Sequence, residues 1–154
     1  MRRVTGAPTI RTATAADGIA ASAIFDASRA HNLAFLPVLH TRAEDDAFFT
    51  AAVARDAWVA VDADDRPLAF AVFHDGMLAH LYVHPDAQGQ GLGSALLEAA
   101  KAAHPKGFSL FVFQRNERAR RFYERRGFRA VRFDRDNEED EPDILERWPG
   151  ADPA

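Results

Sequence analysis

The chain has 154 residues, no cysteine and a formal net charge of −4, from 23 acidic and 19 basic side chains. This length suits one domain with its own core, and the lack of cysteine excludes a disulfide framework, a thiolate zinc site and a cysteine nucleophile. The acidic balance disfavours a nucleic-acid-binding module. Because no apolar run approaches the ~20 residues of a membrane span, we expect a soluble cytoplasmic protein. Abundant Ala, Arg and Asp with few Lys are typical of a GC-rich bacterial genome.

The first part of the chain predicts one strand and then a helix. Alternation over 9–12 indicates the strand. Thr14-Ala15-Ala16-Asp17 resembles a capping box, with Asp in place of Glu, and predicts that a helix begins there. Helical spacing places on one apolar face the residues Ile19, Ala23, Ile24 and Ala27. A connector from His31 to Thr41 follows.

A second helix and three strands come next. Thr41-Arg42-Ala43-Glu44 is a full capping box, which predicts a helix from this point to about Ala54. Its apolar positions are Phe48, Ala51 and Ala52. The strands are expected at 58–61, 68–73 and 77–83. Asp75-Gly76 is a two-residue hairpin signal between the last two.

The second half alternates helices and strands. Helices are expected at 92–103 and 117–126, and strands at 108–113, 128–133 and 144–148. The strand at 108–113 is almost entirely apolar, which predicts burial on both faces. Gly127 stands where a helix C-terminus needs it, and 134–142 is an acidic loop. The order β-α-α-β-β-β-α-β-α-β-β predicts an α+β domain over 9–149, between a flexible tail at 1–8 and a tail at 150–154.

The stretch from Leu78 to Leu97 joins a strand to a helix through three glycines at alternate positions, Gly89, Gly91 and Gly93. Glycine allows a close approach to a ligand and φ values that a Cβ penalises. The helix leaves its first N–H groups unpaired beside a partial positive charge, so the loop predicts a phosphate site. Its spacing fits neither the G-x-G-x-x-G dinucleotide fingerprint nor the phosphate loop with Lys-Ser/Thr.

Two motifs resemble those of the GNAT superfamily of acetyl-CoA-dependent N-acetyltransferases. The first is Q/R-x-x-G-x-G/A at Gln88, Gly91 and Gly93, the pyrophosphate loop of that family. The second, N-x-x-A-x-x-F-Y-E-x-x-G-F, runs from Asn116 to Phe128. The order of predicted elements also resembles the GNAT order throughout. The resemblance implies a three-layer fold with a mixed, mostly antiparallel sheet of six to seven strands and about four helices.

The resemblance also implies a set of acetyl-CoA-binding residues. The end of the strand before the loop offers backbone groups to the acetyl carbonyl and the pantetheine arm. The loop and first helical turn hold the pyrophosphate through their N–H groups, and Asn116 hydrogen-bonds the pantetheine. The implied positions are Leu81, Tyr82, Val83, Gln88, Gly89, Gln90, Gly91, Leu92, Gly93, Ser94, Asn116, Ala119 and Tyr123.

The resemblance makes Tyr123 the general acid that protonates the departing CoA thiolate. Tyr123 lies two helical turns after Asn116 and therefore on the same side of the helix. A phenol with its ordinary pKa near ~10 is protonated at neutral pH and can start as an acid. The alternative is a core tyrosine packed beside Phe122 and Phe128.

The general base is not evident in the sequence. His80 is the nearest titratable residue, and its ordinary pKa suits the task, but a half-buried structural histidine is the alternative. Strand alternation groups His80 with Tyr82 and does not tell which face meets the substrate. Glu138 and Glu139 could attract a cationic amine or relay its proton, or simply be solvated. His80 and His84 lie about 13 Å apart in a strand, too far to share a metal ion, so no metal is expected.

The resemblance implies an acyltransferase that moves the acetyl group of acetyl-CoA to a primary amine of a small molecule or peptide by direct attack. Two alternatives are an acyl-CoA-binding sensor and, from the arginine run at 115–132, a modifier of aminoacyl-tRNA. Arg120 is a candidate for the CoA 3′-phosphate. We expect the connector and the acidic loop to choose the amine, and relatives imply a homodimer as one alternative. The amine, the base, the oligomeric state and the use of longer acyl-CoAs are left open.

Overall fold

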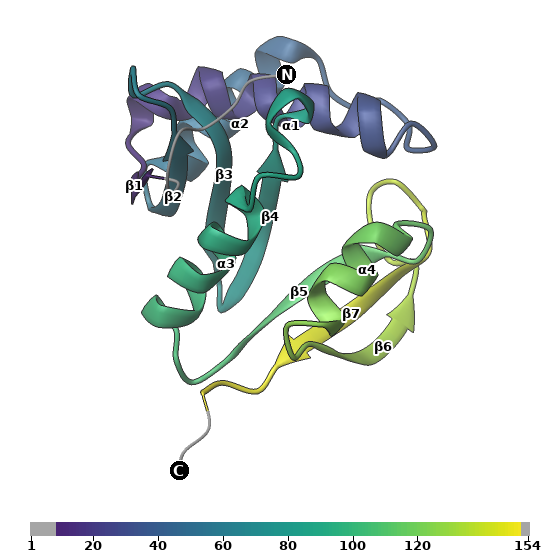
Figure 1. Cartoon of the computed structure of the whole chain (residues 1–154). Coiled ribbons are helices and arrows are strands. Elements are labelled where there is room, and N and C mark those ends of the chain that lie inside the picture. Colours follow the sequence, from purple (N-terminus) through teal and green to yellow (C-terminus); the bar gives the residue numbers. More distant parts are fainter. Residues whose placement is uncertain (1–8, 152–154) are drawn as a thin grey trace.

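The computed structural model describes residues 9–151 (Figure 1). The expected tail at 1–8 lies outside the described residues, as do residues 152–154 of the C-terminal one. Residues 150 and 151 of the C-terminal tail are described, and the N–H of Ala151 donates to the Pro105 carbonyl over 2.8 Å. The elements are β1 (Thr9–Thr12), α1 (Gly18–Asn32), α2 (Arg42–Val53), β2 (Asp56–Val61), β3 (Pro67–His74), β4 (Met77–Val83), α3 (Leu92–Ala103), β5 (Phe108–Phe113), α4 (Glu117–Glu124), β6 (Arg129–Asp134) and β7 (Asp143–Trp148), with short 3₁₀ turns η1 (Ala15–Asp17) and η2 (Pro85–Ala87).

Local sequence signals place several of these elements where they were predicted. The bounds of β4, α3 and β5 are those expected. At the capping box of α2, the N–H of Glu44 donates to Thr41 Oγ1 over 3.1 Å and the N–H of Thr41 donates to Glu44 Oε1 over 2.8 Å. Asp75 and Gly76 have φ of 50° and 75°, as a tight hairpin between twisted strands requires.

The seven strands form one sheet in the order β1-β2-β3-β4-β5-β7-β6, and every neighbouring pair except β4 and β5 is antiparallel. The fold is therefore the predicted α+β domain with a mostly antiparallel sheet. One apolar cluster packs α1 and α2 against β2 and β3, and the other packs α3 and α4 against the opposite face. Helices thus cover both faces of the N-terminal part of the sheet (Figure 1).

The apolar face predicted for α1 is correct at Ile24, which is buried, but wrong at Ile19. Ile19 is 58% exposed, and the side chains that face the core include Ala21, Ser22 and Ile24. The cause is the close approach of α1 to α2, since a Cβ built on Gly18 would lie 2.4 Å from Thr50. Small residues, not the largest apolar ones, therefore occupy the contact.

The prediction that β5 is buried on both faces is also wrong, because Phe111 is 51% exposed. Phe108, Leu110 and Val112 face the α3–α4 cluster, while Phe111 points to the other side. The helices on that side, α1 and α2, pack against β2 and β3 instead.

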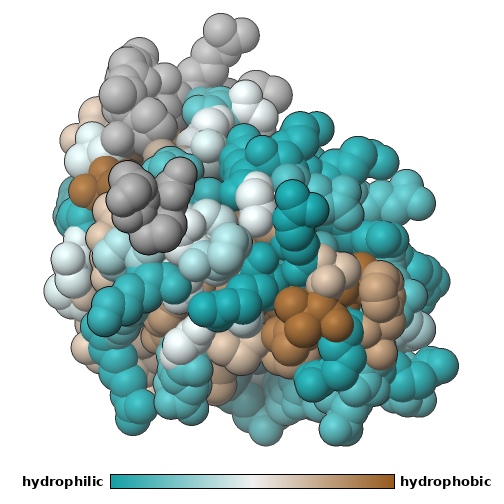
Figure 2. All heavy atoms as spheres, turned by 90° about the horizontal axis from the view of Figure 1, so that it is seen from below, coloured by the Kyte–Doolittle hydropathy of each residue, from teal (hydrophilic) through white to brown (hydrophobic). Residues whose placement is uncertain are grey.

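Seen from below, the surface is mostly hydrophilic, with one compact hydrophobic patch (Figure 2).

The join between β4 and β5 opens the space for the site. The only register pair between these two strands in the described chain joins Met77, the first residue of β4, to Ser109, the second residue of β5, whereas β5 and β7 pair along their full lengths. The two parallel strands therefore diverge toward their C-terminal ends. The gap lies between a half made of β1–β4 with α1–α3 and a half made of β5–β7 with α4 (Figure 1).

Candidate functional site

The glycine loop after β4 has the backbone of an anion cradle. Gly89 and Gly91 have φ of 80° and 81°, which side chains with a Cβ rarely adopt. Gly91 is the N-cap of α3 and makes no side-chain cap bond, so the first-turn N–H groups of this helix are available to an anion. The sequence predicted φ values that a Cβ would penalise at all three glycines, and Gly93 departs from this prediction. It lacks a positive φ, and an added Cβ would meet Val83 at an ordinary 3.6 Å.

Gln88 fixes this loop to both halves of the molecule. Its Nε2 donates to the Val83 carbonyl at the end of β4 over 3.2 Å. Its Oε1 accepts from Arg118 Nη1 on α4 over 3.0 Å. The side chain therefore holds the loop against both β4 and α4.

A groove of about 430 Å³, here called the glycine groove, begins at this loop. Every predicted cofactor-binding residue except Gln90 lines it. The sequence did not single out its further lining residues Ser28, Asn32, Leu33, Arg118, Arg125 and Arg126. The arginine run at 115–132 was the sequence signal for the three arginines of this groove. Arg120, the member of the run predicted to meet the CoA 3′-phosphate, donates to the Gln114 carbonyl over 3.0 Å and does not line the groove.

Asn116 and Tyr123 both lie in the glycine groove on α4, as their spacing predicted. Asn116 is also the N-cap of α4, where its Oδ1 accepts from the N–H of Ala119 over 3.3 Å. Tyr123 is buried, with its ring 5.2 Å from that of Phe122 and 5.3 Å from that of Phe128. Tyr123 is therefore both a core residue and a groove residue, and its burial raises the pKa of its phenol well above the usual range.

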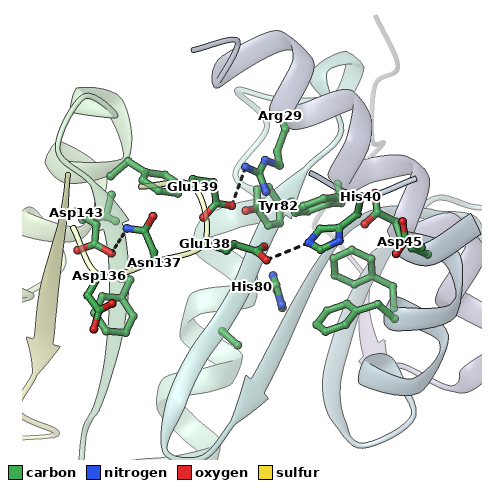
Figure 3. Close-up of a pocket in the computed structure, with 18 residues that line it drawn as sticks. Arg29, His40, Asp45, His80, Tyr82, Asp136, Asn137, Glu138, Glu139 and Asp143 are labelled. Atoms are coloured by element: carbon green, nitrogen blue, oxygen red, sulfur yellow. Dashed lines mark hydrogen bonds and ion pairs between the residues drawn. The ribbon is translucent and has the colours of Figure 1, made fainter. Parts of the chain in front are cut away.

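A second cavity of about 430 Å³, here called the acidic pocket, lies on the other side of β4 (Figure 3). Its interior is aromatic, from Phe25, Phe48 and Phe49 on the helices, His80 and Tyr82 on β4, and Phe111 and Phe113 on β5. Its carboxyl groups are those of Glu44, Asp45, Asp136, Glu138, Glu139 and Asp143. Arg29 and His40 are its basic residues. Burial raises the pKa of Asp45, a consequence of the apolar surroundings.

His80 faces this pocket from β4, on the same side of the strand as Tyr82, and a bulge precedes it. Val72 pairs with His80 and Phe73 with Leu78, so Ala79 is an extra residue between them. The imidazole lies 5.1 Å from the ring of Phe49 and 5.7 Å from that of Phe48. Its Nδ1 is buried and has no hydrogen-bond partner within the described chain. Burial, and then the charge of Arg29, lower the pKa of His80 to about 4, so the ring is neutral at pH 7.

The acidic loop is not simply solvated, because two of its residues form ion pairs across the pocket. Glu139 accepts from Arg29 Nη2 on α1 over 3.1 Å, and its side chain is only 9% exposed. Glu138 Oε2 lies 3.0 Å from His40 Nε2 in the connector, with both side chains exposed. The loop and the connector, which were expected to choose a substrate, therefore meet at the same pocket (Figure 3).

Tyr82 lines both the glycine groove and the acidic pocket. Its neighbours on β4 alternate, with Leu81 and Val83 packed on the α3–α4 cluster and Tyr82 on the α1–α2 cluster. A molecule in one cavity and a molecule in the other would thus meet beside Tyr82. Burial raises the pKa of this phenol, so Tyr82 is neutral at pH 7.

Other residues named from the sequence have partners of their own within residues 9–151. His84 Nδ1 accepts from the N–H of Asp86 over 3.1 Å, and no group of three or more histidine and acidic side chains in this range could hold a metal ion. Within the arginine run, Arg115 pairs with Glu141, and Arg132 with Asp134 over 3.6 Å. None of the helices described is long and apolar enough to cross a membrane.

Comparison with known proteins adds independent information. Residues 53–130 match the family model of the acetyltransferase (GNAT) domain. The peptidyl-lysine N-acetyltransferase YjaB of Salmonella typhimurium is 36% identical over 74 residues, which are 48% of this chain and 50% of that protein. The chain thus aligns with about half the length of this relative.

Two further comparisons cover more of the molecule. The peptidyl-lysine N-acetyltransferase YiaC of Escherichia coli is 32% identical over 102 residues, 62% of this chain and 69% of that protein. The solution structure of apo-form YjaB from Escherichia coli superposes with a TM-score of 0.77 at 26% identity, covering 95% of this chain and 100% of that one. The architecture is therefore shared over nearly the whole chain.

Proposed function

The chain belongs to the GNAT family of acetyltransferases, and from this premise we propose that it transfers the acetyl group of acetyl-CoA to a primary amine. The observation that carries the proposal is the position of Tyr82, which lines both the glycine groove and the acidic pocket. The groove has the chemistry of a phosphate-bearing donor. The pocket has the chemistry of a cationic acceptor.

The glycine groove suits acetyl-CoA. Gly89 and Gly91 turn the backbone so that the first N–H groups of α3 can bind the pyrophosphate, and the helix dipole favours the negative charge. Arg118, Arg125 and Arg126 supply positive charge along the same groove. Asn116 lies where it can contact the pantetheine arm, and backbone groups at the end of β4 can contact the thioester.

We assign the general acid to Tyr123. Its phenol is protonated at pH 7, so it begins the reaction with a proton to give, and its raised pKa makes it a weaker acid than a free tyrosine. As the amine nitrogen bonds to the acetyl carbon, the carbon–sulfur bond breaks and the sulfur takes the Tyr123 proton. The same burial raises the pKa of a departing thiolate, which favours this transfer. The nitrogen then releases its surplus proton to water or to a carboxylate of the pocket, and the Tyr123 phenolate regains a proton from water.

The acidic pocket suits an ammonium ion. Its carboxylates attract the cation, and its aromatic interior accommodates an aliphatic chain and stabilises a cation over a ring face. The ammonium must lose a proton before attack, to a carboxylate of the pocket or to water. The pKa of about 4 disfavours His80 as this base, and we assign its neutral ring to the wall of the pocket.

The relatives suggest the kind of amine. Both YjaB of Salmonella typhimurium and YiaC of Escherichia coli are named as peptidyl-lysine N-acetyltransferases. A lysine side chain combines an aliphatic stem with a terminal ammonium ion, which matches an aromatic interior lined with carboxylates. We therefore propose the lysine side chain of a peptide as the acceptor.

Acetyl-CoA turnover over a panel of amines tests the proposal, with the release of free thiol as the measurement. We expect turnover with lysine-like amines and, for Tyr123→Phe, a fall in kcat of about 10²- to 10⁴-fold, the usual contribution of a general acid. Equal turnover by the variant would remove Tyr123 as the acid. Tight CoA binding without turnover of any amine would instead favour an acyl-CoA-binding sensor.

A further inference from the structure

We propose that Glu146 acts on the reaction through Tyr123: as a neutral acid it lets the phenol give up its proton, and as a carboxylate it holds that proton back. Glu146 lines neither the glycine groove nor the acidic pocket, so it is a positioning residue that limits catalysis at high pH. This inference rests on the proposed function, since it concerns the general acid of the same reaction.

Glu146 lies on the face of β7 that belongs to the α3–α4 cluster. Its neighbours on that face, Ile144 and Trp148, are part of the cluster or pack against it, and strand alternation places Glu146 between them. In the sheet it pairs with Leu110 of β5, another member of the cluster. Tyr123 joins the same cluster from α4. The carboxyl group and the phenol therefore share one apolar layer, although they lie on different elements.

The carboxyl group of Glu146 is buried without a hydrogen-bond partner. The residue is 1% exposed, and neither carboxyl oxygen has a partner among residues 9–151. Two other buried carboxyl groups of this range do have donors. Asp17 accepts from Arg11 Nη1 over 2.9 Å. Asp143 accepts from Asn137 Nδ2 over 3.0 Å. Because burying an unpaired carboxylate costs far more than burying a neutral acid, Glu146 occupies its place as the neutral acid.

The charged groups that act on Glu146 come from α4. Burial, and then the charge of Glu124, raise the pKa of Glu146, while the charge of Arg120 lowers it by less. Arg120 donates to the Gln114 carbonyl over 3.0 Å instead of to Glu146. On α3, Lys101 donates to a backbone carbonyl beyond the end of α4 over 2.7 Å. Both cations nearest to this layer are therefore committed to backbone groups.

The strands beside β7 present apolar side chains to Glu146. Its register partners are Leu110 of β5 and Ala130 of β6. The neighbouring arginines of β6 and β7, Arg129 and Arg147, pair with each other one position along, and alternation places them on the opposite face of the sheet. The sheet therefore adds no compensating charge on the side where Glu146 lies within the described chain.

An ionised Glu146 weakens Tyr123 as an acid. Burial, then the charge of Tyr82 and then that of Glu146, raise the pKa of the Tyr123 phenol. A second negative charge in the same apolar layer makes the phenolate costlier to form, so the sulfur receives its proton more slowly. Below the pKa of Glu146 the carboxyl group is neutral and this effect is absent. As the pH rises through that pKa, the effect appears and the reaction slows.

The experiment compares kcat for the wild type and for Glu146→Gln, which resembles the neutral acid in shape and cannot ionise. Acetyl-CoA and Nα-acetyl-lysine methylamide are the substrates, over the pH range in which both proteins are folded. The ratio of the variant's kcat to the wild-type kcat cancels the titration of the amine. We expect this ratio to be near one at low pH and to rise at least about tenfold at high pH, part of the 10²- to 10⁴-fold that a general acid contributes. Glu146→Met, an apolar replacement of similar length, should behave in the same way.

Tyr123→Phe tests whether the effect passes through Tyr123. We expect the residual kcat of Tyr123→Phe and of Tyr123→Phe/Glu146→Gln to have the same pH dependence, because the group on which Glu146 acts is missing from both. An effect that Glu146 exerted through the fold alone would persist in this background.

Glu117→Gln is the matched control. It removes a carboxylate from α4 itself, but this side chain is 73% exposed and pairs with Arg121. We expect the wild-type pH dependence for it, and melting temperatures over the same pH range establish that all variants are folded. A pH-independent ratio for folded Glu146→Gln and Glu146→Met would overturn the inference. So would the same pH-dependent difference in the Tyr123→Phe background or in Glu117→Gln.

A second measurement does not depend on turnover. Carboxyl ¹³C NMR of the folded protein should show one glutamate signal that is missing in Glu146→Gln and titrates above the ordinary pKa of glutamic acid. Titration at or below that pKa would overturn the inference. A wild type that turns over no amine while this signal behaves as expected would instead count against the proposed function.

Discussion

At the scale of single residues, the glycines of the loop show that one motif can contain two physical requirements. Gly89 and Gly91 satisfy a backbone requirement, since their φ values are in the left-handed region. Gly93 is helical, and its added Cβ would meet Val83 and Phe122 at 3.6 and 3.7 Å. The motif accordingly accepts Gly or Ala at the last position, and the geometry explains why.

This difference gives a residue-scale prediction. Gly91→Ala places a Cβ in a left-handed conformation at a cost of about 1–2 kcal/mol, so we expect CoA to bind roughly tenfold more weakly. Gly93→Ala should change the dissociation constant by less than about twofold, because an ordinary contact replaces open space. Calorimetric titration with CoA measures both. Equal losses in the two variants would contradict the distinction between them.

At the scale of elements, the ends of helices follow the local sequence closely, while their buried faces do not. The capping box at Thr41 begins α2 at Arg42, and Gly127, with φ of 93°, follows the end of α4. The buried face of α1 instead depends on the approach of α2 at Gly18, a contact with Thr50 that no local pattern contains. Capping is a local interaction, and packing is not.

The capping box supplies a prediction at this scale. Thr41→Ala removes the side-chain acceptor of the Glu44 N–H, which typically costs about 1 kcal/mol, so the melting temperature should fall by roughly 2–4 °C. Glu44→Gln keeps a side-chain acceptor for the Thr41 N–H, and we expect a smaller fall. Thermal denaturation followed by circular dichroism checks both variants. A larger loss for Glu44→Gln than for Thr41→Ala would show that charge, not the cap, stabilises this end.

At the scale of the whole molecule, the site lies between two halves that share an apolar core and several polar contacts. Lys101 of α3 donates to the Arg126 carbonyl over 2.7 Å, and further contacts join Gln88 with Arg118, Glu139 with Arg29, and Glu138 with His40. The last of these bridges contains a histidine. Its strength therefore depends on pH.

The hydrogen bond to Glu138 raises the pKa of His40, with smaller contributions from the charges of Glu138, Glu44 and Asp45. A raised pKa in the folded state means that the ion pair is fully present below the ordinary pKa of about 6.5 and is lost as the pH rises through the folded-state pKa. We expect an NMR titration to give a lower His40 pKa in Glu138→Gln than in the wild type. An identical pKa in the two proteins would show that the ion pair does not form in solution.

The sequence predicts the features that depend on residues close together in the chain, and it misses those that depend on contacts between distant segments. The bounds of α3 and the hairpin at Asp75 follow from local spacing and turn chemistry. The glycine groove was predicted because its residues form two motifs. The ion pair of Arg29 with Glu139 joins positions 110 residues apart and leaves no trace in either segment. The bulge at Ala79, which puts Leu78 on the opposite face of the sheet from His80, depends likewise on the register with β3.

The position of Tyr82 has a consequence for the order of events. Tyr82 lines both the glycine groove and the acidic pocket, so a molecule in each cavity would contact the same residue. In the reaction proposed above, donor and acceptor are therefore bound at the same time, and no acetylated form of the protein is required between them. In the proposed reaction, the acetyl group therefore passes from the CoA sulfur to the amine nitrogen beside Tyr82, which lines both cavities.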